Sequence, residues 1–366
     1  MRGEDPLTRP IILGAGPAGC AAAITLGRKG ARPLLIDRDE IVGDALCGGF
    51  MSWRTAQTVG TLGVDLASLG ARPVNRLALF AASKRVETRL PATAYGLSRR
   101  AFDTALRRAA LDAGAGLEID RARTIAPGRV MGECEDWTGD ALFLATGKHD
   151  IRGSSRPRSA SDPALGLRVR VPASKRFDRE VGDRIELHLF DGGYAGIVLQ
   201  EDGSANVCLA VRKSRLHDAG GSPVALLDVL CETHPVFAAR MENRPSDGAI
   251  DTIGAVPYGW IAEDTQDGIY RLGDQAAVIP SLAGEGMSIA IASGIMGAQA
   301  YLAGTGAPTF QAEFARRASG PVRRAERIWH SAENTRIAPW ALAFLSAVPA
   351  AADWAMRTTR IAQPAQ

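Results

Sequence analysis

The segment from residue 9 to residue 37 constrains the fold of this 366-residue chain more than any other part of it. It starts with the short apolar run 9–13 and continues with the glycine-rich stretch 14–19, whose sequence is GAGPAG. An alanine-rich stretch then reaches Lys29, and a second apolar run follows at 33–36. This order predicts a buried strand, a tight turn, a helix and a second buried strand.

The glycines of this turn have separate functions in dinucleotide binding. Gly14 permits the tight turn, Gly16 lets the backbone approach a pyrophosphate, and Gly19 lets the helix pack closely on the strand. Pro17 and Ala18 begin the helix, whose N-terminal N–H groups and dipole attract phosphate. The turn therefore predicts a pyrophosphate site.

An acidic residue ends the second apolar run, as this interpretation requires. Asp37 can accept hydrogen bonds from ribose hydroxyls, and Arg38 follows it directly. The chain contains 40 glycines, so the glycine pattern alone arises easily by chance. The alternative is an ordinary strand–helix–strand unit whose glycines serve only geometry. The strand, helix and acid in the right order favour dinucleotide binding.

Composition excludes several classes of protein. Lys and Arg number 43 against 40 Asp and Glu, and this balance predicts no nucleic-acid partner. The five cysteines form no CxxC pair, and the five histidines have no metal-binding spacing, so we expect free thiols and no metal site. The chain opens without a secretory signal, and no apolar stretch is long enough to span a bilayer. We expect a cytoplasmic protein.

Further along the chain, the sequence pattern changes twice. Runs at 184–190, 194–199 and 205–211 are separated by glycine turns, and they predict antiparallel strands, followed by a helical stretch at about 223–243. From residue 268 a strand and a second glycine-rich turn return. We therefore expect discontinuous domains: a nucleotide-binding domain at 1–73, 98–160 and 257–305, a β-rich substrate domain at 74–97 and 161–256, and a C-terminal helical segment at 306–366.

Four motifs stand together in an order that matches a known family. They are the 14–19 turn with Asp37, Arg99 ahead of a Phe-Asp pair, the Ala-Thr-Gly strand end at 145–147, and Gly-Asp at 273–274 with Gly-Glu-Gly at 284–286. The chain resembles the FAD-dependent oxidoreductases of the para-hydroxybenzoate hydroxylase fold, in the geranylgeranyl-reductase-like and flavin monooxygenase branch. The resemblance implies an α/β fold: a Rossmann-like FAD-binding domain, an inserted antiparallel β-sheet substrate domain and C-terminal helices.

The resemblance also implies a role for each matching residue. The turn would hold the FAD pyrophosphate with help from Arg99, and Asp37 would bind the adenosine ribose. Asp274 would bind the ribityl or pyrophosphate part, and a helix N-terminus after residue 284 would lie beside the flavin N1–C2=O edge. The cofactor-binding residues implied are Gly14, Gly16, Pro17, Ala18, Gly19, Asp37, Arg38, Arg99, Asp274, Gly284, Gly286 and Met287.

Two of these roles have plain alternatives. Asp274 fits a helix cap as well, and Arg99 fits a solvated arginine at a helix start, with Arg100 as a rival for the same role. The apolar spacing over 99–113 predicts an amphipathic helix, on which we expect Asp103 to be exposed. The chain has no second nucleotide fingerprint, so NAD(P)H would bind transiently, or a partner reductase would supply the electrons.

The predicted substrate site lies on two other segments. Cys47-Gly48-Gly49 resembles the Cys-Gly-Gly segment of the reductase branch, which lies near the isoalloxazine, and this makes Cys47 the candidate catalytic residue. The alternative is a small buried thiol. Tyr194 stands where relatives place aromatic residues facing the flavin, so it would stack on or hydrogen-bond to substrate. As a core tyrosine it would do neither.

Three functions stay open from the sequence. We favour a monooxygenase that oxidises an apolar or aromatic small molecule through a flavin C4a-hydroperoxide. The alternative is a flavin-dependent reductase of polyprenyl or other conjugated double bonds, and the least favoured is a non-catalytic prenyl-binding protein. Halogenases of the fold that this chain resembles carry a WxWxIP motif and a catalytic lysine near the flavin. This chain lacks the motif and has Ala45 in place of that lysine, so halogenation is disfavoured. Residues 339–356 predict two short helices over the core, with a weak membrane-surface contact as the alternative.

Overall fold

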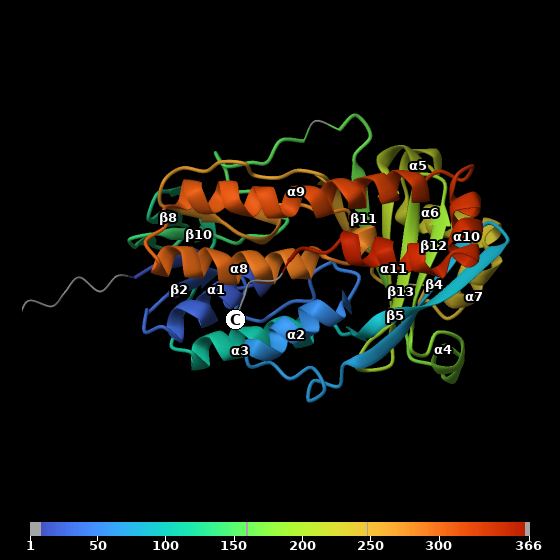
Figure 1. Ribbon diagram of the computed structural model, residues 1–366, viewed down its shortest axis with the longest axis horizontal. Coiled ribbons are helices and arrows are strands. Elements are labelled where there is room, and N and C mark those ends of the chain that lie inside the picture. The colour runs from blue at the N-terminus through green and yellow to red at the C-terminus, as the bar shows by residue number, and fades with distance from the viewer. Residues whose placement is uncertain (1–8, 159, 247, 363–366) are drawn as a thin grey trace, which may run out of the picture.

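The computed structural model describes residues 9–158, 160–246 and 248–362. A parallel sheet and a larger curled sheet lie at opposite ends of the molecule, and helices cover both (Figure 1). A mixed α/β fold is thus confirmed. Whether the two sheets form domains with the predicted boundaries stays a prediction.

The first sheet has five parallel strands in the order β16-β10-β1-β2-β6. Its central strands are fully buried because both faces are covered, as parallel sheets require. The predicted strand–turn–helix–strand unit is present as β1, α1 and β2. The strands are β1 (Ile11–Leu13), β2 (Leu34–Asp37), β6 (Gly116–Ile119), β10 (Leu142–Leu144) and β16 (Ile269–Arg271).

Two helices pack on this sheet at very short range. The helices are α1 (Pro17–Gly27) and α8 (Gly286–Leu302), and both are rich in glycine and alanine. A Cβ at Gly294 of α8 would lie only 2.3 Å from the carbonyl oxygen of Ala18. This close approach fixes both helix N-termini at one edge of the sheet. The other helices at this end are α2 (Trp53–Thr61), α3 (Arg99–Asp112) and the first half of α9 (Ala307–Ala332).

The second sheet has eight strands in the order β15-β11-β14-β13-β12-β4-β5-β3. The expectation of an antiparallel sheet is wrong at one pair, because β12 runs parallel to β4. The chain reaches β12 from β4 through the first sheet, so no hairpin constrains their direction. The strands are β3 (Phe50–Met51), β4 (Arg72–Ala81), β5 (Lys84–Gly96), β11 (Ala164–Val171), β12 (Arg184–Phe190), β13 (Gly193–Leu199), β14 (Ala205–Arg212) and β15 (Asp251–Val256).

Helices cover both faces of this second sheet. On one face, α6 (Pro223–Thr233) and α7 (Pro235–Met241) pack against β11, β13 and β14. Pro235 divides the predicted helical stretch, because proline starts a helix readily but breaks one internally. On the other face lie the end of α9, with Trp329, and the helix α10 (Ala338–Ala347). The two short helices expected near the C-terminus are α10 and α11 (Pro349–Thr358).

Some elements were not expected from the sequence. A small three-stranded sheet is formed by β7 (Ala122–Ala126), β8 (Arg129–Gly132) and β9 (Asp136–Thr138). In the predicted C-terminal helical segment, the 26-residue helix α9 contains Pro321 and runs from the first sheet to the second (Figure 1). No helix in the described part of the chain is long and apolar enough to cross a membrane. The remaining short helices are α4 (Lys175–Glu180) and α5 (Lys213–Asp218).

We predict that Gly294→Ala lowers the free energy of unfolding by about 1–3 kcal/mol, because the added methyl overpacks the α1–α8 contact. The matched control is Gly60→Ala in α2, where a Cβ meets nothing within 4 Å. The control should raise the free energy of unfolding by up to about 1 kcal/mol, because alanine is the better helix former. Urea denaturation measures both. Equal effects would show that the helices do not touch here.

Candidate cofactor and substrate site

One large cavity lies between the two sheets. Its volume is about 900 Å³, at the upper end of the range for small-molecule sites. Its walls come from the turn after β1, the loop 42–48, the N-terminal turn of α8, and one face of the second sheet. Residues far apart in sequence therefore face a single space.

The three glycines of the first turn differ in what surrounds them. Gly14 has a φ of +106°, and a Cβ there would lie 2.5 Å from the carbonyl oxygen of Ala145. A Cβ at Gly19 would lie 1.9 Å from the carbonyl oxygen of Gly14, so this glycine serves helix packing and does not line the cavity. A Cβ at Gly16 would meet only the Arg99 guanidinium, at 4.0 Å. Gly16 alone has open space above it, inside the cavity.

Asp37 is placed by the backbone of the same turn. Its carboxylate accepts hydrogen bonds from the N–H of Ala15 at 2.6 Å and of Asp39 at 3.0 Å. Arg107 lies 3.5 Å away and adds a positive charge. Arg38 contacts His149 across the cavity edge at 3.3 Å. Both predicted residues, Asp37 and Arg38, line the cavity beside Pro17 and Ala18.

Arg99 and Asp103 form a buried ion pair on α3. Arg99 donates to both carboxylate oxygens of Asp103, at 2.8 and 2.6 Å. Burial opposes the charge on Arg99, but Asp103 and the Cys47 thiol keep the pKa of Arg99 above its ordinary value. The expected exposure of Asp103 is wrong, since it is 6% exposed. The side of α3 that carries this pair faces the cavity, which an amphipathic pattern does not reveal.

The second glycine-rich turn lies opposite the first. Asp274, Gly284, Gly286 and Met287 all line the cavity, and α8 starts there. Gly284 takes a left-handed conformation with φ of +66°, where a Cβ would touch the Phe50 ring at 3.0 Å. Two helix N-termini, those of α1 and α8, are thus open to the same cavity.

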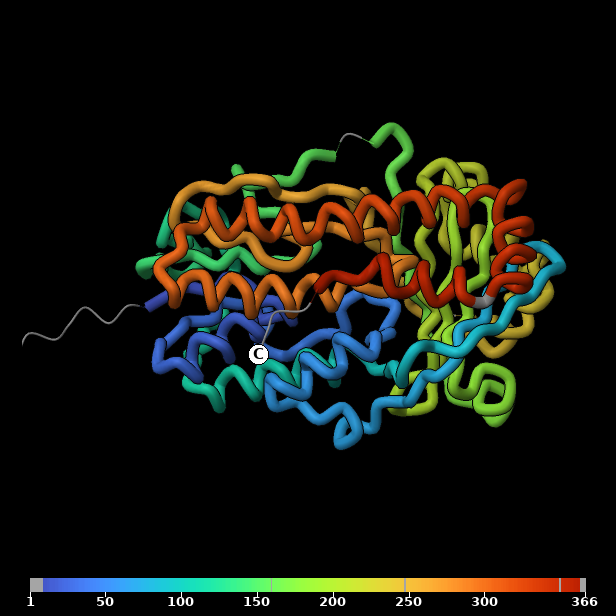
Figure 2. The backbone as a smooth tube through the Cα atoms, in the orientation of Figure 1, coloured from blue at the N-terminus to red at the C-terminus, as the bar shows by residue number. Residues whose placement is uncertain are grey.

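The C-terminal segment is joined to this turn. Arg360 forms a buried ion pair with Glu285, and its guanidinium lies 3.8 Å from the centre of the Trp53 ring. Figure 2 shows the chain running back from α11 toward α8. Met356 and Arg360 line the cavity, so the C-terminal segment is part of its wall.

The Cys-Gly-Gly segment meets the cavity through its first two residues. Cys47 is half-buried and Gly48 is exposed, and both line the cavity. Gly49, predicted in the substrate pocket, lies behind this wall. Its φ is +68°, and a Cβ there would lie 2.5 Å from the amide nitrogen of Gln200. Gly49 therefore serves the close packing of the loop on the sheet.

Three hydroxyl groups meet at the other side of the cavity. Tyr194 donates to Ser281 at 2.8 Å, and Tyr258 lies 2.6 Å from the same Ser281 oxygen. The Trp329 ring packs edge-on against both tyrosine rings. Burial raises the pKa of both tyrosines, so both are neutral at neutral pH. Tyr194 is thus both a core residue and a cavity residue.

Several residues of the site had no signal in the sequence. Tyr258 belongs to no motif of the sequence, and Ser281 starts the second glycine-rich turn, where its residue type alone predicts no role. Arg168 and Arg170 alternate with apolar residues on β11, and this alternation predicts that both lie on one face of the strand. It does not predict their contact with the loop 44–47. Within the described residues, no three His, Cys, Asp or Glu side chains converge as metal ligands do.

Comparisons with known sequences find named reductases and protein FixC. No family model matches the chain. It is 26% identical over 312 residues to digeranylgeranylglycerophospholipid reductase 2 of Methanopyrus kandleri, which covers 78% of this chain and 74% of the relative. It is 25% identical over 357 residues to protein FixC of Escherichia coli, covering 86% and 82%.

Comparisons with solved structures find proteins that share the fold of this chain. The flavin-dependent brominase Bmp2 matches with a TM-score of 0.75 and 16% identity, over 96% of this chain and 93% of that one. PqsL of P. aeruginosa, in complex with 2-aminobenzoylacetate, matches with 0.73 and 16%, over 90% and 98%. By fold and by sequence, the chain resembles flavoprotein oxidoreductases.

A reductase-like protein belongs to the same set of structural matches. The geranylgeranyl bacteriochlorophyll reductase-like protein of Thermoplasma acidophilum matches with a TM-score of 0.71 and 18% identity, over 97% of this chain and 93% of that one. The predicted resemblance to both branches of this flavoprotein fold is thus confirmed. The residue roles that it implies stay predictions.

We predict that Gly16→Val leaves the fold intact but weakens FAD binding at least about 100-fold. The valine side chain would occupy only the open space of the cavity, where the pyrophosphate is expected. Flavin content after purification and FAD titration measure the loss, and the melting temperature checks the fold. Gly60→Ala is the control and should keep its flavin. Full flavin content in the Gly16→Val variant would contradict the predicted placement.

Proposed function

We propose that this protein uses FAD to reduce a carbon–carbon double bond in an apolar, chain-like substrate. The observation that carries the proposal is a cavity that extends from the first glycine turn to an apolar wall of the second sheet. The named reductases among its relatives support the same reaction. The sequence alone favours oxygenation, which stays the second candidate.

The residues of the cavity suit FAD. Gly16 leaves space for a pyrophosphate, Asp37 has a carboxylate beside the same turn, and Arg99 supplies a buried positive charge. The N-terminus of α8 lines the cavity, and its helix dipole would favour negative charge at the flavin N1–C2=O edge. Bound FAD would supply the two-electron chemistry; the chain binds it, excludes water and places the substrate.

The apolar wall suits a long hydrocarbon. It lies between the second sheet and the C-terminal helices, where Met356 closes it from the helix side. No charged side chain is needed to hold such a substrate, because burial of its apolar surface favours binding. The wall includes Leu77, Leu90, Ile185 and Leu187.

The hydroxyl cluster can donate one hydrogen bond to the substrate. Tyr194, Ser281 and Tyr258 carry one proton each, and the two hydrogen bonds among them use two protons. One hydroxyl proton is therefore available to a bound molecule, whichever of Ser281 and Tyr258 is the donor. The cluster would hold a polar end of the substrate or supply the proton that a reduced double bond needs.

Oxygenation is supported by different observations. The structural matches include a flavin-dependent brominase. They also include PqsL, which is described as a probable FAD-dependent monooxygenase. A cavity that excludes water also suits oxygen transfer. In either reaction the electrons come from NAD(P)H bound transiently or from a partner protein, and we expect the protein to work in the cytoplasm.

Cys47 separates the two reactions. If Cys47 supplies a proton to a geranylgeranyl lipid, Cys47→Ser and Cys47→Ala should lower the rate of its reduction about 100-fold, within the range for lost acid–base assistance. The variants should keep their FAD. If the enzyme is an oxygenase, turnover should stay within about tenfold, with hydrogen peroxide released in place of product. Cys231→Ser, on α6 and outside the cavity, is the control and should keep full activity.

The C-terminal helices carry an exposed apolar patch through which an apolar substrate could enter from a lipid surface. Residues 337–352 contain no charged residue, yet Trp340 and Phe344 of α10 are 77% and 58% exposed, and Trp354 of α11 is 61% exposed. A helix that is apolar all round is normally buried on all sides. Lys84 lies 5.8 Å from the Trp340 ring and pairs with no carboxylate of the described chain. This patch fits an anionic lipid surface.

We predict that the full chain binds phosphatidylglycerol vesicles more tightly than phosphatidylcholine vesicles. The double variant Trp340→Ser/Phe344→Ser should bind at least about fivefold less, because it loses the aromatic anchors. The matched control is Val224→Ser/Val236→Ser, which changes two exposed apolar residues of α6 and α7. Co-sedimentation measures binding. The prediction would be contradicted if the wild-type protein bound neither kind of vesicle, or if it formed a dimer through the exposed residues of α10 and α11.

A further inference from the structure

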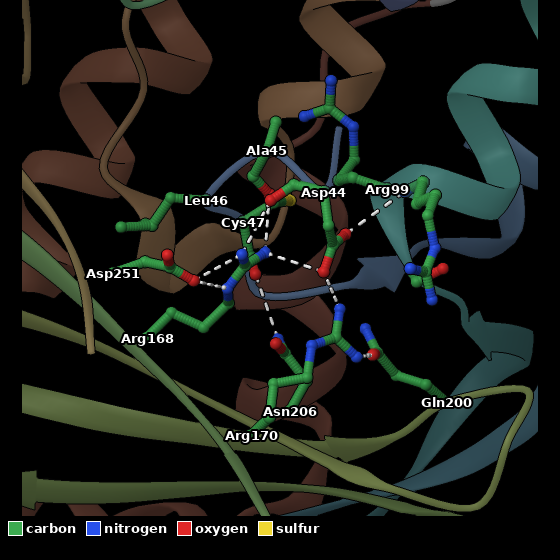
Figure 3. A network of polar contacts seen from close by, with 12 residues as sticks. Asp44, Ala45, Leu46, Cys47, Arg99, Arg168, Arg170, Gln200, Asn206 and Asp251 are labelled. Carbon is green, nitrogen blue, oxygen red and sulfur yellow. Dashed lines mark hydrogen bonds and ion pairs between the residues drawn. The ribbon is translucent and has the colours of Figure 1, made fainter. Parts of the chain in front are cut away.

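The loop before the Cys-Gly-Gly segment is held by its backbone carbonyl groups. Arg168 of β11 donates to the carbonyl oxygen of Asp44 at 2.7 Å and to that of Ala45 at 2.9 Å. The same guanidinium is fixed by the Asp251 carboxylate, at 2.6 and 3.0 Å. Figure 3 shows Arg168 below the loop, reaching up to it from the sheet. Arg168 is 6% exposed, so these bonds are shielded from water.

The next two carbonyl groups are held in the same way by other elements. Lys148, in the loop after β10, donates to the carbonyl oxygen of Leu46 at 2.9 Å. Asn206 of β14 donates to the carbonyl oxygen of Cys47 at 3.0 Å and is fully buried. Four successive carbonyl groups thus accept hydrogen bonds from three side chains that lie far away in sequence. We call Arg168, Lys148 and Asn206 the carbonyl clamp.

The clamp determines where the N–H groups of the loop point. The described chain has no cis peptide bond, and in a trans peptide the N–H points opposite to the carbonyl group of the same plane. The N–H groups of residues 45–48 therefore point away from the clamp side chains. Within the described residues they have no hydrogen-bond acceptor, while residues 42–48 line the cavity. These four residues are exposed or half-buried, so their N–H groups are open to an acceptor on a molecule bound in the cavity.

We propose that Arg168, with Asn206 and Lys148, is a positioning residue that presents the N–H groups of 45–48 to the electron-rich edge of the flavin ring. The proposal rests on the proposed function, because it needs a flavin in the cavity. It also assigns a task to β11 and β14, which belong to the sheet that forms the apolar wall. The sheet that contacts the substrate would then hold the cofactor loop as well.

The clamp has a competing explanation as a structural staple. The chain offers a matched control for this, because Arg212 of β14 makes the same kinds of bond elsewhere. It donates to both carboxylate oxygens of Glu333, at 2.7 and 2.8 Å, and to the carbonyl oxygen of Asp162 at 2.9 Å. Arg212 does not touch the loop or line the cavity. Lysine in place of either arginine keeps the charge but cannot make all these bonds at once.

The test compares Arg168→Lys with Arg212→Lys in the full-length holoenzyme. FAD release on dilution is followed by flavin fluorescence, the flavin reduction potential is measured, and Cys47 alkylation is followed by mass spectrometry. We expect Arg168→Lys to release FAD at least about tenfold faster, to shift the reduction potential, and to alkylate at Cys47 at least about fivefold faster. Arg212→Lys should stay within about twofold of the wild type in all three. Equal behaviour of the two variants would overturn the proposal.

A second variant covers the case in which Arg168→Lys does not fold. Asn206→Leu keeps the side-chain size and removes only the donor to the Cys47 carbonyl, and we expect the same three changes from it. Unchanged FAD release and alkylation in this variant would overturn the proposal too. If the wild type binds no FAD, the proposed function fails, and alkylation of Cys47 still decides whether the clamp holds the loop.

Discussion

The structure depends on a contact between backbones at the first glycine turn. Gly19 touches the carbonyl oxygen of Gly14, and Gly294 brings α8 against the start of α1. Side chains would hold these elements apart, so only glycine and alanine permit the arrangement. As a result, two helix N-termini open on one cavity, and the site follows from the packing of the first sheet.

The second sheet completes this cavity and fixes the loop that crosses it. Burial of apolar side chains forms the wall for substrate, whereas arginine and asparagine side chains of the same sheet hold the carbonyl groups of 44–47. Such buried polar contacts add little net stability, but they specify one loop conformation. The reaction that we propose needs this precision more than it needs ionisable catalytic groups.

Local patterns were sufficient to predict much of this molecule. The unit from β1 to β2, the strands around Tyr194 and the short C-terminal helices follow from periodicity, glycine and proline. The burial of Asp103, the parallel pairing of β12 with β4, and the carbonyl clamp could not be predicted. Each depends on contacts between segments 50 or more residues apart or on the far side of a helix, where a single sequence carries no signal.

The central claim is that one cavity holds the flavin between the first glycine turn and the loop 45–48. A crystal structure of the purified holoenzyme tests this most directly. The account predicts the FAD pyrophosphate over Gly16 at the N-terminus of α1, and the ring edge within hydrogen-bond distance of the N–H groups of 45–48. A ring that lies elsewhere, or a loop whose N–H groups bind only water beside a bound flavin, would contradict it.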